Sequence, residues 1–561
     1  MTSKKVIILG GGVAGMSVAH ELLARNDHGV HFEIEVYERK LHLPGGKARS
    51  IPVPNSGTDG RPNLPGEHGF RFFPGFYRHL PDTMRGIPVA GGGTVFDHLV
   101  PVSRIEIART GKRPIIACAR FPRTFTDMAA VLREVFGTDL DLRPGELEFF
   151  AARIWQIMTS CADRRLDSYE KLSWWHYLEA DRFSLAYQHL LANGLSRSLL
   201  ANNPHFASAR TVGDTNVQLL LDLAEPGSEA DRILNGPTNE TWLAPWLTHL
   251  QSDPSCTYRL GCDVQRLLCA GGRIEGVVIH DGVSARVVTG DYYVCAVPVE
   301  RMASLLERSK TPTAEHPLGL DPTLASLATL AHNVAWMNGI QFFLRRDVPV
   351  VPGHTLYVDS LWALTSISEA QFWSHVNLGD TGDGTVHGVL SVCISDWDSA
   401  GVFGQKAKEC TRQQIAADVW EQLKRGLNVD GTVVLDDADL HSWFLDPDIA
   451  DDPAARQSRY DDLEPLLVNF ANTWCLRPDA FTRIPNLWLA ADYVRTNTDV
   501  ACMEAANEAA RRAVNCLLEA AGSRASWCAV WQLHEPLVLA PFRAHDQTRY
   551  DRGLPWSGDI L

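Results

Sequence analysis

The first forty residues carry the pattern that constrains the fold most. A short β-branched apolar run, residues 5–9, is typical of a buried parallel strand and leads directly into a glycine-rich turn. Small and apolar residues then recur at helical spacing up to Arg25, and residues 31–39 alternate as a second strand. A strand, turn, helix and strand in this order predict an α/β fold with a Rossmann-type domain.

The turn contains three glycines spaced for a dinucleotide. Gly10 would permit the sharp turn, Gly12 would let the backbone approach a pyrophosphate, and Gly15 would let the helix pack closely on the strand. The helix begins near Val13 and Ala14, and its free N–H groups and positive dipole end would face the phosphates. We therefore include these five residues in the predicted cofactor site.

The second strand and the loop after it extend this site. Glu38 ends the strand, where a carboxylate can accept hydrogen bonds from free ribose hydroxyls, so FAD or NAD is favoured over NADP. Arg39 follows and is included in the site. Gly45, Gly46 and Lys47 then form a second close-approach loop, where a simple NAD-binding fold would continue with a helix and a third strand.

Composition excludes several functional classes. The chain has 561 residues, of which 45% are hydrophobic and 21% charged, as in a soluble globular protein. A net charge of −15 argues against nucleic-acid binding. No apolar run is long enough to cross a membrane, so we expect a cytoplasmic protein. The 12 cysteines lack C-x-x-C spacing, which predicts free, mostly buried thiols and no metal site.

A dense aromatic stretch, GEHGFRFFPGFYRHL at 66–80, follows the two glycine loops. With these loops, the sequence resembles the flavin amine oxidase and phytoene desaturase superfamily, and within it the plant- and cyanobacterial-type carotenoid desaturases and hydroxysqualene dehydroxylase. The superfamily stretch E-x-G-(hydrophobic)-(H/R)-x-F-x-G-x-Y is matched at seven positions. These positions are Glu67, Gly69, Phe70, Arg71, Phe73, Gly75 and Tyr77.

Two later segments also resemble this superfamily. Residues 262–282 form a hairpin pattern and lead into a strand and helix at 291–306, which implies that Val264 lies by the adenine and that Pro298 closes the nucleotide domain. Residues 486–514 resemble the C-terminal signature, which implies that Asp492 meets the pyrophosphate or ribityl chain.

The last signature contains a predicted helix that begins near Ala501. Its first turn, with Met503 and Glu504, would aim at the flavin, where negative charge grows on reduction. From the residues alone, Thr498 or Asp499 can cap the helix N-terminus, and Gly522 can end it.

The resemblance implies a GR2-like FAD-binding domain interleaved with an α+β substrate domain. The predicted ranges are 1–80, 246–306 and 471–522 for FAD, 81–245 and 307–470 for substrate, and 523–561 for a C-terminal tail. Residues 144–202 are expected to be helical, as a lipid-lined tunnel or membrane-dipping surface or as an ordinary core. Residues 336–348 and 388–397 are expected in an antiparallel sheet against the flavin. The tail would cover the FAD domain or join a dimer contact.

An acidic segment lies between residues 436 and 464. Its ten acidic side chains show no fixed ligand spacing, which predicts a solvated loop rather than a metal site. They are Asp436, Asp437, Asp439, Asp446, Asp448, Asp451, Asp452, Asp461, Asp462 and Glu464.

The resemblance implies an FAD-dependent oxidoreductase that desaturates a hydrophobic substrate, an isoprenoid, carotenoid-like or other long lipid, by hydride transfer to the flavin. Glu67, His68 and Arg71 are the candidate catalytic residues. Gly69, Phe70 and Arg71 are expected to contact the cofactor. The substrate would be collected by peripheral membrane contact. The electron acceptor, the catalytic base and a homo-oligomeric state stay open. The alternatives are an amine oxidase of the same fold, a non-redox FAD-dependent isomerase, cyclase or dehydroxylase, and a non-catalytic scaffold.

Overall fold

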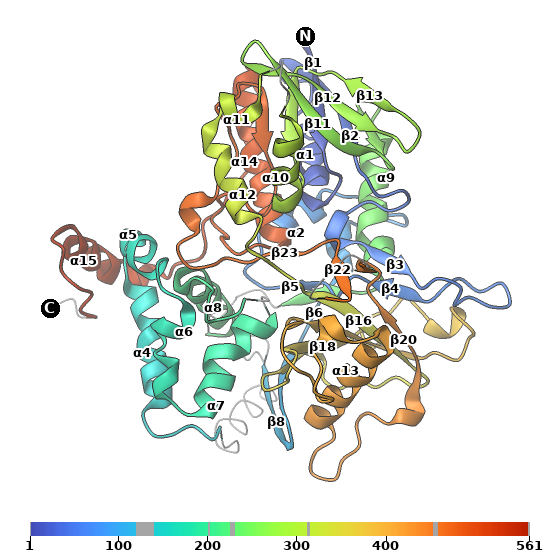
Figure 1. Cartoon of the computed structure of the whole chain (residues 1–561), viewed down its shortest axis with the longest axis vertical. Helices are drawn as coiled ribbons and strands as arrows, with labels where there is room; N and C mark the ends of the chain where they lie inside the picture. Colours follow the sequence, from blue (N-terminus) through green and yellow to red (C-terminus); the bar gives the residue numbers. More distant parts are fainter. Residues whose placement is uncertain are drawn as a thin grey trace.

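The computed structural model describes residues 2–118, 140–199, 202–224, 231–310, 315–452 and 458–558, and arranges them in three lobes (Figure 1). The upper lobe contains the chain's first strands and its last long helix, the lower right lobe a large sheet, and the lower left lobe a group of helices. Residues 119–139 of the predicted substrate domain, and residues 200–201 of the predicted helical segment, lie outside the described residues. The domain boundaries stay a prediction.

A five-stranded parallel sheet forms the centre of the upper lobe, as the glycine pattern predicted. Every neighbouring pair of its strands is parallel. In spatial order the strands are β10 (Cys256–Arg259), β2 (Val30–Tyr37), β1 (Thr2–Leu9), β14 (Tyr292–Cys295) and β24 (Leu487–Leu489). Since these strands come from distant parts of the sequence, the chain leaves this lobe and returns to it twice.

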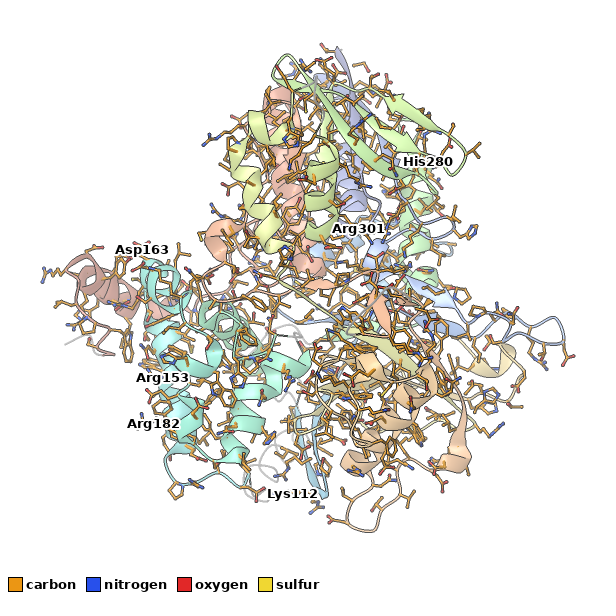
Figure 2. All side chains as sticks on the ribbon, in the orientation of Figure 1. Lys112, Arg153, Asp163, Arg182, His280 and Arg301 are labelled. Atoms are coloured by element: carbon orange, nitrogen blue, oxygen red, sulfur yellow. The ribbon has the colours of Figure 1, made fainter. Side chains whose placement is uncertain are left out.

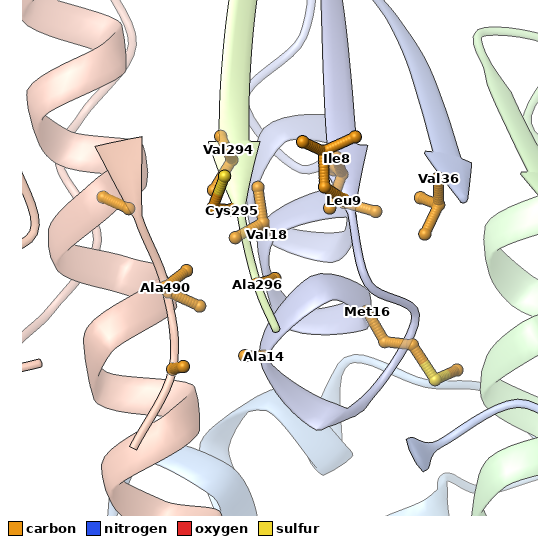
Figure 3. Close-up of a cluster of buried hydrophobic side chains, with 14 of the residues drawn as sticks. Ile8, Leu9, Ala14, Met16, Val18, Val36, Val294, Cys295, Ala296 and Ala490 are labelled. Atoms are coloured by element: carbon orange, nitrogen blue, oxygen red, sulfur yellow. The ribbon is translucent and has the colours of Figure 1, made fainter. Parts of the chain in front are cut away.

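Helices and a small antiparallel sheet surround the parallel sheet. They are α1 (Val13–Leu23), α9 (Ala244–Ser252), α10 (Val299–Arg308), α14 (Met503–Ala521), β11 (Asp263–Ala270), β12 (Arg273–His280) and β13 (Ala285–Val288). Figure 3 shows Ile8 and Val294 of the sheet beside Val18 of α1, in one buried apolar cluster. Burying such a side chain contributes roughly 1.5–3 kcal/mol. The first strand, helix and second strand, and the later hairpin, are therefore confirmed.

A seven-stranded sheet forms the lower right lobe. In spatial order its strands are β20 (Leu440–Leu445), β16 (Asn338–Leu344), β19 (Gly388–Ile394), β18 (Leu364–Ser368), β17 (Gly353–Tyr357), β7 (Arg104–Arg109) and β8 (Lys112–Cys118). The predicted strands at 336–348 and 388–397 are β16 and β19, and they pair antiparallel. The sheet is not purely antiparallel as expected, because β17 and β7 pair in parallel. Helix α13 (Arg412–Leu427) packs on the apolar face of this sheet.

The lower left lobe is helical, as predicted for 144–202. Its helices are α4 (Glu146–Thr159), α5 (Ala162–Arg164), α6 (Trp174–Tyr177), α7 (Leu185–Tyr187) and α8 (Ala209–Ala224), with π-helical turns at Arg165–Tyr169 and Gln188–Leu199. Ile154, Ile157 and Trp174 are buried together, as in an ordinary helical core. Leu147, in the first turn of α4, is 49% exposed.

The remaining helices and strands are mostly short. They are α2 (His79–Arg85), α11 (Pro317–Leu320), α12 (Ser326–Leu330), α15 (Ala540–Asp551), β3 (Ser50–Pro52), β4 (Pro65–Glu67), β5 (Phe72–Phe73), β6 (Leu99–Pro101), β9 (Arg232–Leu234), β15 (Val334–Ala335), β21 (Ile449–Asp451), β22 (Tyr460–Asp462) and β23 (Leu466–Leu467). Within the described ranges, no helix combines the length and the apolar character needed to cross a bilayer. All twelve cysteines are free and most are buried, as predicted.

Candidate functional site

A cavity of about 540 Å³ lies between the parallel sheet and the seven-stranded sheet. Gly10 and Gly12, just after β1, line it at one end, and Cys393 of β19 lines it at the other. Ligands of doubly wound sheets bind outside the carboxyl ends of the strands, which is where this cavity begins. We call the part next to the parallel sheet the nucleotide end, and the part next to the seven-stranded sheet the reaction end.

The three glycines of the first turn have different structural roles. Gly10 has a φ of +105°, and a Cβ added there would lie 2.6 Å from the oxygen of Ala296. A Cβ at Gly15 would lie 1.9 Å from the oxygen of Gly10, so Gly15 serves helix packing as predicted. Gly15 does not line the cavity, which corrects its inclusion in the cofactor site. A Cβ at Gly12 would meet no protein atom closer than 3.8 Å. Gly12 therefore leaves a space that the protein itself does not fill.

The N-terminus of α1 opens onto this space. Gly12 is its N-cap residue and supplies no side-chain hydrogen bond, and Val13 and Ala14 line the cavity. The free N–H groups and the positive dipole end of the helix suit a phosphate. This end of the cavity thus fits the pyrophosphate of a dinucleotide.

Glu38 also lines the nucleotide end. Its carboxylate accepts hydrogen bonds from the backbone N–H groups of Gly11 (2.9 Å) and Lys40 (2.8 Å), and burial raises its pKa. A carboxylate has further lone pairs that can accept from ribose hydroxyls. Tyr258 of β10, which sequence reasoning missed, donates to the Gly11 oxygen over 2.6 Å and holds the turn in place.

The second glycine loop packs directly on the first. Gly45 has a φ of +94°, and its N–H donates to the Gly11 oxygen over 3.0 Å. Gly45, Gly46 and Lys47 all line the cavity. The Lys47 ammonium donates to the oxygen of Pro465 and lies 3.5 Å from Glu300.

Helix α10 contributes two arginines that the sequence analysis overlooked. Arg301 and Arg308 line the cavity together with Val264, Pro298 and Arg39. Arg301 lies at the lower end of the upper lobe (Figure 2). Residues seven apart share one face of a helix, so this spacing after Pro298 was a signal that could have identified them.

Arg71 ties the wall of the reaction end to the second glycine loop. Its guanidinium donates to the oxygens of Ala48 (2.9 Å) and Lys47 (3.0 Å), and burial lowers its pKa. Gly69 and Phe70 line the cavity beside it. Gly69 has a φ of +127°, and an added Cβ would lie 3.1 Å from the Cys393 sulfur.

His68 lines the reaction end and belongs to a buried ion-pair network. Its Nδ1 lies 2.6 Å from Asp446 and 3.4 Å from Asp448. Burial by itself would lower the pKa of His68, but these two carboxylates raise it to about 9. Asp448 also pairs with Lys40 (2.9 Å) and with Arg49. Despite burial, the neighbouring His68, Arg49 and Lys40 hold the pKa of Asp448 below its usual range.

The prediction of a solvated acidic loop at 436–464 is therefore wrong for four residues. Asp446, Asp448, Asp462 and Glu464 are buried, whereas Asp461 is exposed. The reason is that the fold brings cations from the cofactor loops onto this segment, including Arg39, which pairs with Glu464.

His68, Asp446 and Asp448 also have the composition of a metal site, and their ligand atoms lie within 4.8 Å of one another. The separation of 2.6 Å between His68 Nδ1 and the Asp446 carboxylate is that of a close ion pair. Asp448 already has two cationic partners. The geometry thus favours an ion-pair network over a bound metal.

Glu67 lies outside the set of described residues that line the cavity, in contrast to its neighbour His68. Its carboxylate accepts from the N–H and hydroxyl of Thr238, both at 2.8 Å, and its N–H donates to Gln341. Burial raises the pKa of Glu67 and that of nearby Glu369. Glu67 therefore supports the cavity wall and does not face the cavity. This corrects its prediction as a catalytic residue.

The structure also corrects the predicted role of Glu504, which was expected to face the flavin. Its carboxylate accepts from the N–H groups of Arg78 (2.7 Å), His79 (2.6 Å) and Leu80 (2.9 Å), so it caps α2 instead of lining the cavity. Its neighbour Met503 does line the cavity.

The start of α14 also differs from the prediction. Its N-cap residue is Cys502, whereas Thr498 donates to Glu508 and Asp499 accepts from Thr211. Gly522 ends the helix as predicted, with a φ of +68°. Asp492 lines the cavity, and its backbone oxygen accepts from Arg477 over 2.7 Å.

Solved structures share this fold at low sequence identity. An oxidoreductase from Methanosarcina mazei is 14% identical with a TM-score of 0.57, over 92% of this chain and 100% of that one. Cyclohexylamine oxidase from Brevibacterium oxydans IH-35A is 13% identical with a TM-score of 0.56, over 92% and 99%. A candidate protoporphyrinogen oxidase from Exiguobacterium sp. 255-15 is 16% identical with a TM-score of 0.54, over 92% and 99%.

Sequence comparison identifies the family. No curated protein matches the chain. The family described as flavin-containing amine oxidoreductases matches residues 13–518, which is nearly the whole chain and includes the second glycine loop and the C-terminal signature. The protein therefore belongs to the flavin-containing amine oxidoreductase family and is a flavin-dependent oxidoreductase.

Proposed function

We propose that the protein binds FAD along the whole cavity and desaturates an uncharged, apolar substrate at the reaction end. The cavity extends from Val264 and Arg308 beside the parallel sheet to Cys393 of the seven-stranded sheet. A dinucleotide suits this length, because a mononucleotide would leave the end at Glu38 empty. A bound flavin supplies the hydride-accepting chemistry.

The charge of the reaction end carries the proposal for the substrate. Among the described lining residues, the acidic ones are Glu38, Asp263, Glu464 and Asp492. Glu38 and Asp492 follow strands of the parallel sheet, Asp263 begins β11, and Glu464 pairs with Arg39, so we assign all four to the nucleotide end. The charged side chains at the reaction end are His68 and Arg71, both cationic.

A protonated amine would meet like charges there and find no carboxylate partner, which disfavours it. The rest of this wall is largely apolar and includes Phe70, Phe72, Leu219 and Met337. Such a wall suits a hydrocarbon, for example an isoprenoid or another long lipid.

His68 and Arg71 hold positive charge beside the reacting atoms. Asp446 lies 2.6 Å from His68 Nδ1 and, together with Asp448, raises the pKa of His68 to about 9, so the imidazole already carries its proton at neutral pH. His68 is therefore unsuited to take a proton from the substrate. Its role is to stabilise negative charge that develops at this end of the cavity.

Amine oxidation is the second candidate, because cyclohexylamine oxidase and putrescine oxidase share the fold. In this cavity an amine would have to bind as the free base, since the two cations repel its protonated form. The activity with amines should then rise steeply with pH.

Peripheral membrane contact is part of the proposal, because a long lipid resides in a bilayer. Leu537 and Val538 are 87% and 77% exposed on the loop before α15 and are candidates for this contact. Flotation with neutral phospholipid vesicles tests it, and Leu537→Ser/Val538→Ser should reduce the floated fraction. A wild-type protein that stays at the bottom of the gradient contradicts it.

The deciding experiment combines the visible spectrum of the purified protein with anaerobic reduction. We expect a flavin spectrum, release of FAD on denaturation, and bleaching of the flavin by a long isoprenoid in detergent. Cyclohexylamine and putrescine serve as matched amine substrates. Bleaching by amines alone would contradict the desaturase proposal, and a colourless protein that takes up no FAD would contradict the cofactor.

A further inference from the structure

We propose that residues 528–534 act as a strap that holds the helical lobe against the start of α14 and so sets the width of the reaction end. The strap thereby determines which substrate sizes can enter. Only this last consequence rests on the proposed function, because the strap itself is a property of the chain.

The first half of the strap is bound to the body of α14. The N–H of Cys528 donates to Asn515 Oδ1 (2.6 Å), and Asn515 Nδ2 donates to the oxygen of Cys528 (3.0 Å). The oxygen of Trp531 accepts from Asn497 over 2.8 Å. Side chains thus bind both the donor and the acceptor groups of the strap backbone.

Trp531 is also linked to the wall of the cavity through His79. The N–H of Trp531 donates to His79 Nε2 over 2.9 Å, so Nδ1 carries the imidazole hydrogen and donates to Glu504 over 2.8 Å. Glu504 follows Met503, which lines the reaction end. The strap is therefore attached to the first turn of α14, at the cavity wall.

The second half of the strap is bound to α8. Gln218 Oε1 accepts from the N–H of His534 and Gln218 Nε2 donates to the oxygen of His534, both over 3.0 Å. Gln218 is buried. Thr215 and Leu219, on the same helix turn, line the cavity. A movement of Gln218 would therefore move the wall opposite Met503.

The chain beyond His534 secures the rest of the helical lobe. Asp546 accepts from Arg164 Nε over 2.9 Å, and Trp556 Nε1 donates to Thr159 over 3.1 Å. Val217 and Leu221 of α8 belong to the apolar core of the same lobe. The helical lobe and α8 thus form one unit that the strap connects to α14.

Chain length limits how far this unit can move. Three residue steps separate Trp531 from His534, and an extended chain covers at most roughly 10–11 Å in three steps. While both ends stay bound, α8 cannot move farther than this from the Trp531 anchor. Thr211 at the start of α8 is held separately, because it donates to Asp499 over 2.6 Å. A longer strap should therefore let the part of α8 around Gln218 move and widen the cavity beside it.

Two variants test the strap. The first inserts Gly-Ser-Gly between Leu533 and His534, which lengthens the strap and leaves its contacts available. The second, Gln218→Ala, removes both hydrogen bonds to His534. The matched controls are the same insertion after Ser557, beyond the Trp556 contact, and Gln547→Ala, which removes an amide contact to Asp163 (2.8 Å) away from α8.

The first measurement is hydrogen–deuterium exchange of residues 212–223, which requires no flavin. We expect about tenfold faster exchange in both strap variants and wild-type exchange in both controls. In the flavin-loaded protein, the acrylamide quenching constant of flavin fluorescence should at least double.

The strap proposal is contradicted if the insertion variant folds and hydrogen exchange in α8 is unchanged. It is also contradicted if the quenching of flavin fluorescence is unchanged in this variant. A colourless protein contradicts FAD binding instead. The exchange measurement, which requires no flavin, then tests the strap proposal by itself. The two proposals can therefore fail separately.

Discussion

The two ends of the cavity are built in different ways. The nucleotide end comes mainly from backbone within the first fifty residues, where Gly12 and Gly45 lie side by side. The reaction end combines distant segments, with Arg71, Leu219, Cys393 and Met503 among its lining residues. One end therefore depends on local backbone geometry, and the other on side chains that only the folded chain brings together.

The largest expected effect concerns the backbone of the nucleotide end. Gly15→Ala would place a Cβ 1.9 Å from the Gly10 oxygen, and we expect a loss of about 4 kcal/mol of stability or no folded protein. Gly12→Ala should keep the wild-type Tm within about 2 °C but weaken FAD binding on the order of 10–100-fold, because only a ligand meets its Cβ. Thermal unfolding and FAD titration measure these effects. Wild-type FAD affinity in Gly12→Ala would remove the contrast between the two glycines.

The second prediction concerns charge pairing at the reaction end. The raised pKa of His68 means that its pairing stabilises the fold fully below about pH 6.5, and that this stabilisation is lost as the pH rises through about 9. The free energy of unfolding should fall by up to about 3 kcal/mol across this window. Asp446→Asn should cost about 3 kcal/mol at neutral pH and weaken this pH dependence, because Asp448 stays beside His68. Urea unfolding at about pH 6, 8 and 10 provides the measurement, and a wild-type profile in Asp446→Asn would exclude the pairing as its source.

The third prediction separates a cap from a cofactor contact. Glu504→Gln should lower stability by about 1–2 kcal/mol, because the carboxylate accepts three N–H groups at the start of α2. The flavin spectrum and the FAD affinity should stay unchanged. A shifted flavin spectrum would instead place Glu504 at the cofactor.

The smallest effect is expected at the exposed end of the acidic segment. Asp461→Asn should change the free energy of unfolding by less than about 0.5 kcal/mol and keep the wild-type pH profile. It is the matched control for Asp446→Asn, because both remove one carboxylate from the same segment. A large loss of stability in urea would show that exposure does not distinguish these two acids.

Several features of the fold could be predicted because their signals are local. The run ending at Leu9, the glycine turn and the alternation before Glu38 each restrict the backbone within a few residues. The hairpin at 262–282 and the end of helix α14 at Gly522 could be predicted for the same reason, because short local patterns restrict the backbone there. Such patterns depend little on the rest of the chain.

The wrong assignments have a common geometric cause. Glu67 and His68 are neighbours in an extended segment, where successive side chains point to opposite sides. Met503 and Glu504 are neighbours on a helix, where successive side chains are rotated by about 100°. In both pairs a motif indicated the correct segment, and only the packing showed which neighbour lines the cavity.

The sequence by itself determined the Rossmann-type edge, the glycine loops and the flavin family, because backbone sterics and helix dipoles act within a short stretch of chain. Only the tertiary structure decided that Asp446 and Asp448 are buried, that α8 lines the cavity, and that the tail crosses from α14 to α8. The physical reason is that these features need partners from distant parts of the sequence. A buried carboxylate needs a nearby cation, and a cavity needs walls on opposite sides. Each is supplied by residues hundreds of positions away, such as His68 for Asp446.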